Sequence, residues 1–484
     1  MRAVIVGCVS FLVGLLVSGV FPHAAPAQTA GTQGRFVVVF AGSQIPPGAG
    51  RLIEAAGGRV AQVFPEVGIA VAVSDSAAFP NTLSRSGLVQ AVGEDRVRQL
   101  PDASATEVES DGGLTEPAAT TCPPTCPAPG VDDLYFLRQW HLRRIRADAA
   151  WTVTTGSSDI VVAVIDNGVA SNHPDLGHLV FNSCFWTRPD ACRPYPSIPF
   201  TQGGSHGTEV AGIIGATFSG GRVVGVGPNL SLANYNVFEI DSATGQPVAF
   251  ESSIWAAMRD ATLNPLVNAR VINLSVGELI VFPQKEAALW TAWNRVAEFV
   301  TRHGVTIVAS SGNEGMSLNG PVAHVPSDLP SVIGVGATGI RPGPLFPQEG
   351  AFDVKAYYAN FGAALTLVAP GGDCGPANPR CIAPILASQV PFFVQSTGVM
   401  PAAACAATAS CLIGYVRDIG TSFAAPHVAG VAGLILSQNP GLNPHQVAAI
   451  LKRTAQPLGD RQEFGHGMVD AAAAVDAATA VSTP

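Results

Sequence analysis

Three short motifs supply an aspartate, a histidine and a serine in an order that suits nucleophilic catalysis. Asp166 is followed by Asn-Gly, His206 is followed by Gly-Thr, and Ser422 ends a Gly-Thr-Ser triplet. A serine hydroxyl is a weak nucleophile, and it needs a base within hydrogen-bonding reach and an acid that orients the base. Taken singly, the first motif is usually a turn and the other two are usually helix caps. Together they indicate a serine activated by a histidine.

The surrounding elements predict how these motifs are positioned. Near-continuous apolar runs, typical of strands buried on both faces, occupy 159–165, 271–274, 305–309 and 331–335. Helical patterns alternate with them at 206–216, 252–262, 284–302, 421–437 and 444–454. This alternation predicts an α/β fold with a mainly parallel sheet and helices on both faces. Each motif falls at a strand-to-helix junction, where the sites of such sheets lie.

The serine motif has the composition of a helix start. Small residues around Ser422 allow a sharp turn, and the helix dipole there favours developing negative charge. We expect Pro426 to be tolerated because it would lie in the first turn.

The order Asp, His, Ser on an α/β scaffold is that of subtilisin, whereas the α/β-hydrolases have the order Ser, Asp or Glu, His. From about residue 133 to 475 the chain resembles the subtilisin-like (subtilase) serine peptidases. The matching segments are 164–169, 173–176, 206–212, 309–315 and 420–430.

The resemblance implies a serine endopeptidase that cleaves peptide bonds through an acyl-enzyme. Ser422 would be the nucleophile, His206 the general base and then acid, and Asp166 the orienter of the imidazole. Asn313 and the Ser422 backbone N–H would bind the oxyanion. The alternative for Asn313 is a purely structural asparagine in a turn beside Gly312.

The resemblance also implies where a protein or peptide substrate binds. An exposed strand that includes Ser275, Val276 and Gly277 would pair with the extended substrate, and Ser310, Ser311 and Gly312 would form the other wall of the S1 pocket. Ordinary sheet edge and loop is the alternative for both segments. His324 would fall near the floor of S1 and shorten it, unless it is a surface loop histidine.

Three residues depart from the family pattern without removing a catalytic atom. Glu209 stands where a second histidine is frequent, Asn167 where Ser or Thr is common, and Phe423 where methionine is frequent. Asn167 can still hydrogen-bond the aspartate. The rival hypothesis is a catalytically silent or narrowly dedicated member that acts as a binding or maturation factor.

The N-terminus has the pattern of a secretory signal peptide over residues 1–27, with Arg2, an apolar run and an Ala-x-Ala ending. A transmembrane anchor is the alternative, because the run is close to the lower limit for a span. Secretion fits the eight remaining cysteines, which we expect to form disulfide bonds rather than a metal site. Nearest neighbours would pair as Cys122/Cys126, Cys184/Cys192, Cys374/Cys381 and Cys405/Cys411.

The chain divides by composition into three further parts. Residues 34–100 read as a small α+β unit, with strands near 36–40, 61–64, 69–73 and 89–92 and helices near 48–56 and 80–88. This unit is similar to the propeptides of secreted subtilases, which act as folding assistants and intramolecular inhibitors; an independent binding domain is the alternative. Residues 101–132 read as a Pro-, Thr- and Ala-rich linker, and 133–484 as the catalytic domain.

Composition limits the partners. Apolar residues make up 47% and charged residues 13%, and the net charge is −9, so nucleic acid is not expected as a partner. We expect a monomer, no membrane attachment once the signal is removed, and no required cofactor. The 217–223 segment lacks the side-chain oxygens of the family's calcium loop, so calcium is expected only elsewhere, with Asp133 and Asp175 as candidate ligands.

Overall fold

The computed structural model describes residues 34–100, 107–109, 139–187, 204–218, 223–241, 244–281, 286–341, 351–373, 393–400 and 412–481. The predicted signal peptide, almost all of the predicted linker and every cysteine except Cys184 lie outside these residues. Cys184 is disulfide-bonded, and the pairing scheme stays a prediction.

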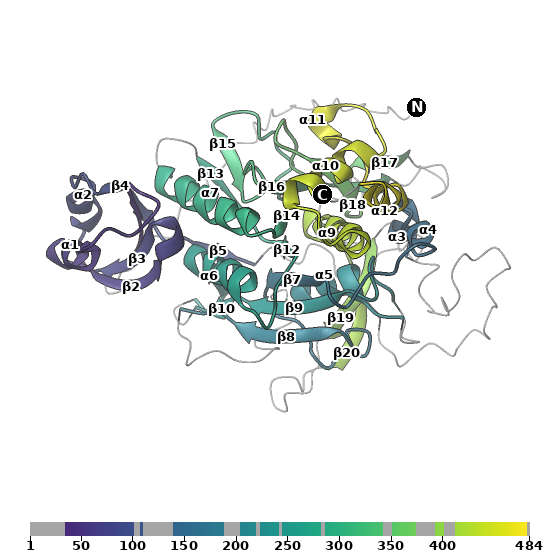
Figure 1. Cartoon of the computed structure of the whole chain (residues 1–484), viewed down its shortest axis with the longest axis horizontal. Coiled ribbons are helices and arrows are strands. Elements are labelled where there is room, and N and C mark those ends of the chain that lie inside the picture. The colour runs from purple at the N-terminus through teal and green to yellow at the C-terminus, as the bar shows by residue number, and fades with distance from the viewer. Residues whose placement is uncertain are drawn as a thin grey trace, which may run out of the picture.

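A large sheet forms the centre of the molecule (Figure 1). Its strands lie in the order β17-β16-β14-β12-β7-β9-β8, and β18 also pairs with β16. All of its pairs are parallel except β16 with β17. The strands are β7 (Val161–Asp166), β8 (Leu179–Cys184), β9 (Ser231–Asn236), β12 (Val271–Leu274), β14 (Thr306–Ser310), β16 (Val332–Arg341), β17 (Ala351–Lys355) and β18 (Leu367–Pro370). The predicted α/β class is confirmed.

Helices cover both faces of this sheet. One face carries α6 (Glu251–Leu263) and α7 (Ala287–Arg302), whereas α3 (Trp140–Arg144), α4 (Ala147–Ala150), α5 (His206–Gly215), α9 (Thr421–Gln438), α10 (Pro444–Thr454) and α12 (Ala471–Thr479) share a core with the other face. The short α11 (Arg461–Phe464) lies between α10 and α12 in the chain. Strand β7 shows why its sequence is continuously apolar: Val162 and Val164 enter one core, while Ala163 and Ile165 enter the other.

Three smaller sheets surround the large one. One has the order β10-β11-β5, a second pairs β13 with β15, and a third has the order β19-β20-β6. Their strands are β5 (Val97–Gln99), β6 (Glu107–Glu109), β10 (Glu239–Ile240), β11 (Pro247–Phe250), β13 (Glu278–Val281), β15 (Val322–Val325), β19 (Val394–Met400) and β20 (Leu412–Asp418). Two of them join segments from before residue 110 to the rest of the chain.

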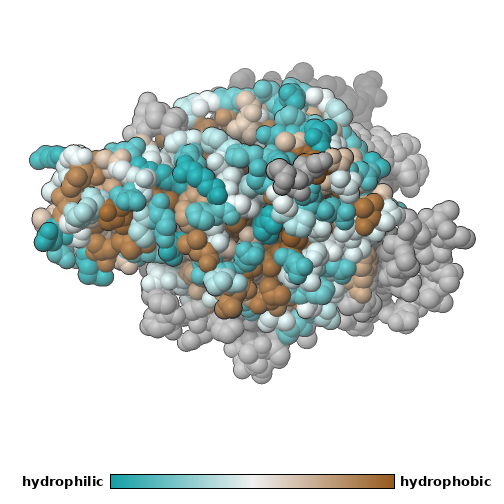
Figure 2. Space-filling view, in the orientation of Figure 1, coloured by the Kyte–Doolittle hydropathy of each residue, from teal (hydrophilic) through white to brown (hydrophobic). Residues whose placement is uncertain are grey.

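Residues 34–100 form a lobe that protrudes from the larger part (Figures 1 and 2). Its four-stranded antiparallel sheet has the order β2-β3-β1-β4, from β1 (Gly34–Phe40), β2 (Arg59–Phe64), β3 (Ile69–Ser74) and β4 (Val89–Glu94). The helical segments are α1 (Ala49–Ala55), η1 (Pro65–Val67) and α2 (Phe79–Leu83). The predicted elements are confirmed, except that α2 ends five residues early. There the Ser84 hydroxyl donates to the Pro80 carbonyl, as side chains at helix ends often do.

This lobe packs against α6 and α7. Apolar side chains of β1 and β3, such as Val37 and Val71, share a core with Trp255 and Trp293 of the two helices. Arg295 of α7 donates to the carbonyls of Phe40 and Val67. The 34–100 lobe is therefore joined to the larger part by both apolar burial and hydrogen bonds.

Candidate active site

The structure brings two of the three predicted catalytic residues into direct contact. Asp166 ends β7 at the carboxyl edge of the sheet, and His206 is the first residue of α5. The imidazole Nδ1 lies 2.8 Å from Asp166 Oδ1 and 3.0 Å from Oδ2. Asp166 is fully buried and His206 is 8% exposed. This geometry holds the ring with Nε2 as its remaining nitrogen, which is what a general base for serine requires.

Asn167 and Gly207 lock the aspartate and the histidine together. The Asn167 backbone N–H donates to Asp166 Oδ1 at 2.7 Å, and the Asn167 side-chain oxygen accepts from the Gly207 N–H at 2.8 Å. A Cβ at position 207 would lie 2.4 Å from the Gly168 carbonyl oxygen. Only glycine allows the start of α5 to approach the end of β7 this closely.

Carboxylates behind the histidine shift its pKa. Burial lowers the pKa of His206, but the charge and hydrogen bond of Asp166 and the charge of Asp418 raise it, and the net direction is upward. Glu209, 3% exposed, lies in the same region. Burial and the charges of Asp418 and Asp166 raise the pKa of Glu209 well above its usual range, while a hydrogen bond from Ser205 lowers it. Its burial therefore favours the protonated form of Glu209.

Ser422 lies in the second position of α9, whose N-cap is Gly420. Its hydroxyl donates to the Ser275 carbonyl at 3.1 Å, and His206 Nε2 has no partner within the described part of the chain. The two segments are nevertheless adjacent, because the Phe423 ring lies 5.6 Å from the His206 ring between centroids. The start of α9 is thus close to the base, and the Ser422 hydroxyl is turned toward Ser275. Catalytic hydrogen bonds often align only when substrate binds.

One expectation about this helix is wrong, because Pro426 lies inside the helix rather than in its first turn. The alternative in which Ser422 is only a helix cap does not hold either, since the N-cap is Gly420. Pro426 has no N–H to donate to the Ser422 carbonyl four residues earlier. The Ser275 hydroxyl donates to that carbonyl instead, at 2.7 Å. Ser275 directly follows β12, so a residue outside the helix satisfies the carbonyl that lacks its helical donor.

Asn313 faces the start of the same helix. Its side-chain oxygen accepts from the backbone N–H of Thr421 at 2.9 Å and from the Thr421 hydroxyl at 2.8 Å. The amide nitrogen makes no hydrogen bond to the part of the chain that the structure describes, and the residue is exposed. With its oxygen fixed, the amide can offer its N–H groups to a developing oxyanion.

The two predicted substrate walls lie on either side of His324. A Cβ at Gly277 would lie 2.1 Å from His324 Cε1, and a Cβ at Gly312 would lie 2.7 Å from His324 Cδ2. The imidazole is 2% exposed, and its Nδ1 lies 2.9 Å from the Ser327 hydroxyl oxygen. The structure thus places His324 between the segments 275–277 and 310–312, and not on a surface loop.

The walls themselves differ from expectation in exposure. β12 ends at Leu274, and both Ser275 and Val276 are buried in the full-length chain. The prediction that they form an exposed strand is therefore wrong for the chain that still carries residues 34–100. Ser310 and Ser311 are buried as well, and Asn360 holds this wall by donating to the Ser311 carbonyl at 3.0 Å.

Reasoning from the sequence missed Asp418 and gave Ser275 only as part of the substrate strand. The hydrogen bond from Ser275 to α9 spans 147 residues, and the effect of Asp418 on the His206 pKa depends on the fold, so no local pattern signals either. Glu209 was noticed only as a departure from the family pattern. Its burial could have been inferred from the apolar surroundings of the α5 sequence.

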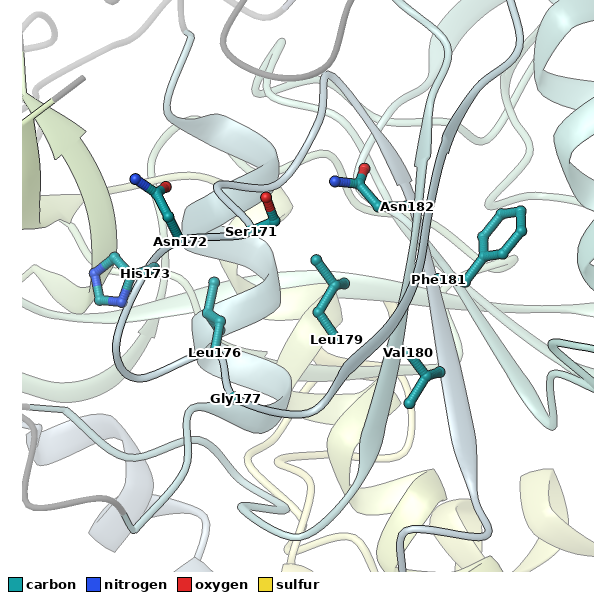
Figure 3. Close-up of a pocket in the computed structure, with 9 residues that line it drawn as sticks. All are labelled: Ser171, Asn172, His173, Leu176, Gly177, Leu179, Val180, Phe181 and Asn182. Carbon is teal, nitrogen blue, oxygen red and sulfur yellow. The ribbon is translucent and has the colours of Figure 1, made fainter. Parts of the chain in front are cut away.

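A separate pocket is formed by the segment that follows Asp166 in the chain, residues 171–182. It is lined by residues of the loop after β7 and of β8, including His173 and Asn182 (Figure 3). None of the predicted catalytic side chains lines it. Among the described residues no group of three or more His, Cys, Asp or Glu side chains could hold a metal ion, and residues 219–222 of the predicted calcium-free loop, as well as Asp133, lie outside them. No helix of the described part is long and apolar enough to cross a membrane.

Comparisons with known proteins identify the family. A model of the subtilase family of peptidases matches residues 157–467. Subtilisin E of Bacillus subtilis is 31% identical over 335 residues, which cover 69% of this chain and 70% of that protein. Subtilisin of Bacillus pumilus has the same identity over the same length, with 69% and 97% covered.

Solved structures extend the likeness. A protease of Pseudoalteromonas arctica is 26% identical with a TM-score of 0.55, covering 72% of this chain and 98% of that one. The epidermin leader peptide processing serine protease of Staphylococcus aureus is 19% identical with a TM-score of 0.67, covering 93% and 100%, and its likeness concerns the fold alone. The chain belongs to the subtilase family and is a serine endopeptidase.

Proposed function

We propose that this chain is a secreted endopeptidase made as a zymogen, in which Asp166, His206 and Ser422 form the catalytic triad. The observation that carries the proposal is the buried Asp166–His206 pair beside the start of α9. Within the family, its substrates are proteins or peptides.

The proposed chemistry is that of a serine peptidase that forms an acyl-enzyme. The Ser422 hydroxyl rotates from the Ser275 carbonyl to His206 Nε2, which takes its proton as the oxygen attacks the scissile carbonyl carbon. The tetrahedral oxyanion accepts hydrogen bonds from the Asn313 amide and the Ser422 backbone N–H. His206 then gives the proton to the leaving amine, and water, deprotonated by His206, hydrolyses the acyl-enzyme.

Contacts of the 34–100 lobe support a role as an inhibitory propeptide. Asp95 accepts from the Ser252 backbone N–H at 3.0 Å and from the Ser252 hydroxyl at 2.7 Å. It therefore caps a backbone N–H that has no partner within the helix at the start of α6. β5 then adds an antiparallel strand to β11, with Arg98 opposite Ala249. Arg98 reaches the Val325 carbonyl, next to His324 between the predicted substrate walls. The lobe therefore leads its C-terminal end toward the substrate site.

Secretion rests on the sequence of residues 1–27, and the rest of the chain is consistent with it through its cysteine content. Action as a monomer and the disulfide pairs are part of the same proposal. A cofactor is not needed for the chemistry described, because each proton transfer and charge is assigned to a protein group.

A fluorophosphonate probe tests the triad, because it bonds only to a serine that a neighbouring base activates. We expect stoichiometric labelling of Ser422 in the purified wild type, located by peptide mass spectrometry, together with cleavage of an unstructured protein substrate. Ser422→Ala should abolish both, and Asp166→Asn should slow labelling strongly because the imidazole loses its orienting charge.

Ser437→Ala is a matched control, since Ser437 lies at the far end of the same helix and donates to the Gly433 carbonyl. It should label like the wild type. A well-folded wild type that neither labels nor cleaves would establish the catalytically silent alternative and contradict the proposal.

A further inference from the structure

The side chain of Arg98 occupies a buried site built by the larger part of the chain. Its Nε donates to Glu251 Oε1 at 2.7 Å and its Nη2 donates to Glu251 Oε2 at 2.9 Å, while Nη1 donates to the Val325 carbonyl at 3.1 Å. The guanidinium lies 5.1 Å from the centre of the Trp293 ring. We call the group Glu251, Glu278, Trp293 and the Val325 carbonyl the Arg98 site.

The chemistry of the Arg98 site is matched to a guanidinium. The Glu251 side chain is fully buried, and Arg98 approaches it with two parallel N–H groups, a geometry that lysine cannot reproduce. Trp293 donates its indole N–H to Glu251 Oε2 at 2.7 Å, which fixes the carboxylate. Its ring also offers a face for cation–π contact.

Glu278 is a second acid at the rim of the Arg98 site. Its side chain is 16% exposed, and its Oε2 lies 3.1 Å from Nη2 of Arg96. Burial and the charge of Glu251 raise the pKa of Glu278 to about 9, although Arg98 and Arg96 act to lower it. Glu251, whose side chain is fully buried, is therefore the acid that pairs with Arg98.

One short segment, residues 275–278, connects the nucleophile with the Arg98 site. The Ser275 carbonyl accepts from the Ser422 hydroxyl, and three positions later Glu278 pairs with Val325, whose carbonyl accepts from Arg98. Gly277 and His324 lie between these two points. An extended peptide that ran along residues 275–278 would advance about 3.3 Å per residue. The side chain that reached the Arg98 site would then belong to the residue about three positions before the one whose carbonyl is cut.

The backbone around Arg98 is already in the form of such a peptide. β5 is an extended strand that pairs antiparallel with β11, the strand directly before Glu251 and α6. If the 34–100 lobe leaves after cleavage, the Glu251 carboxylate loses the guanidinium that pairs with it in the precursor. An arginine of an incoming substrate would restore the lost pair.

We propose that the Arg98 site is a specificity site for an arginine of the substrate, about three residues before the residue whose carbonyl is cut. Arg98 fills this site in the precursor. The inference rests on the proposed function, because it assigns the substrate class of that same site. The alternative is that the Arg98–Glu251 pair serves only to attach the lobe.

Matched peptide substrates test this on the purified active enzyme. One series of internally quenched peptides carries a single arginine at each of the positions two to six residues before the cut, and companion peptides carry lysine or glutamine there. We expect kcat/KM to be at least about tenfold higher for arginine than for glutamine at one position near the fourth, with lysine between them. Equal values for arginine and glutamine at every position, in an enzyme that cleaves, would overturn this inference and leave the proposed function intact.

Glu251→Gln locates the preference. We expect the arginine-to-glutamine ratio of kcat/KM to fall close to one in this variant, while Glu298→Gln, an exposed acid on α7 paired with Arg302, should keep the wild-type ratio. An unchanged ratio in a folded Glu251→Gln enzyme would overturn the assignment. If that variant does not fold, the wild-type peptide series still decides, and an enzyme that neither cleaves any peptide nor reacts with a fluorophosphonate would refute the proposed function as well.

Discussion

Asn313 is oriented by Thr421 before any substrate arrives. The amide oxygen accepts two hydrogen bonds from that residue, so the N–H groups turn toward the place where we propose the oxyanion forms. Asn313→Ala should lower kcat by about 10²–10³ with little change in KM, because the donor acts mainly in the transition state. Steady-state kinetics on a peptide substrate measures this. Asn319→Ala, in the same loop but bonded to Gln462, is the control, and a change mainly in KM at Asn313 would argue against the role.

His206 sets the acid limit of activity. A general base must be neutral, and Asp166 and Asp418 outweigh burial and raise its pKa above 6.5. Activity should therefore fall as pH drops through an apparent pKa above 6.5, and the limb should move to lower pH in Asp418→Asn, which removes one of the raising charges. The pH profile of kcat/KM reports the free enzyme. An acid limb at or below 6.5 in the wild type, or one that Asp418→Asn leaves in place, would be inconsistent with this electrostatic arrangement.

Glu209 contributes to the pH dependence of the free energy of unfolding. Its folded-state pKa is raised, so between the unfolded and folded pKa values the folded state holds more protons and stability falls as pH rises. Glu209→Gln should remove this part of the decline. Chemical denaturation of an inactive Ser422→Ala background at several pH values above 4.5 measures it. An identical pH dependence with and without the substitution would mean that the fold does not raise the Glu209 pKa.

His324 restricts the space between the two predicted substrate walls. Its ring contacts the positions where Gly277 and Gly312 lack a Cβ, so we expect the wild type to disfavour large aromatic P1 residues. His324→Gly should raise kcat/KM for such residues relative to small ones by about tenfold or more, the range that steric pockets achieve. Cleavage of a P1-varied peptide library compares the two forms. Indistinguishable P1 profiles would show that the imidazole does not limit the pocket.

At the scale of elements, α9 depends on a side chain from another segment. The Ser275 hydroxyl donates to the Ser422 carbonyl, whose helical donor is missing at Pro426. Ser275→Ala should destabilise the fold by about 1–3 kcal/mol, the cost of an unsatisfied buried carbonyl.

Pro426→Ala supplies the matched background for this test, because alanine restores the helical N–H. Ser275→Ala should cost less there, although the hydrogen bond from Asn273 to Ser275 is lost in both backgrounds. Denaturant unfolding of the four proteins gives the coupling. Equal costs in both backgrounds would contradict the compensation.

The same elements show how far sequence patterns reach. Buried strands such as β7 and β14 were predictable because both faces are covered, and α5 and α9 were predictable because their motifs start helices. The interior position of Pro426 was not, since it depends on a donor 147 residues away. The burial of Ser275 and Val276 likewise follows from the packing of the whole chain, not from their own sequence.

At the scale of the whole molecule, the predicted triad residues could be named from three motifs, because each motif has a local chemical signature. The Arg98 site could not, because Arg98 and Glu251 are 153 residues apart and each alone is an ordinary charged residue. The lobe's docking on α6 and α7 is of the same kind. The fold brings these residues together, and only then does their chemistry suggest a precursor that occupies its own substrate site.

Maturation connects the lobe to the catalytic serine. If the chain processes itself, Ser422→Ala should accumulate as a longer precursor that still carries residues 34–100. Its folding should survive, because the substitution is small and removes one hydrogen bond, from the Ser422 hydroxyl to the Ser275 carbonyl, worth about 0.5–1.5 kcal/mol.

Intact-mass measurement of wild type and Ser422→Ala, secreted from a host without extracellular proteases, tests the proposal most directly. The proposal predicts a wild type that has lost the lobe and a variant that keeps it, with Ser437→Ala processed like the wild type. Trimming of Ser422→Ala to the wild-type N-terminus would contradict self-processing by this serine.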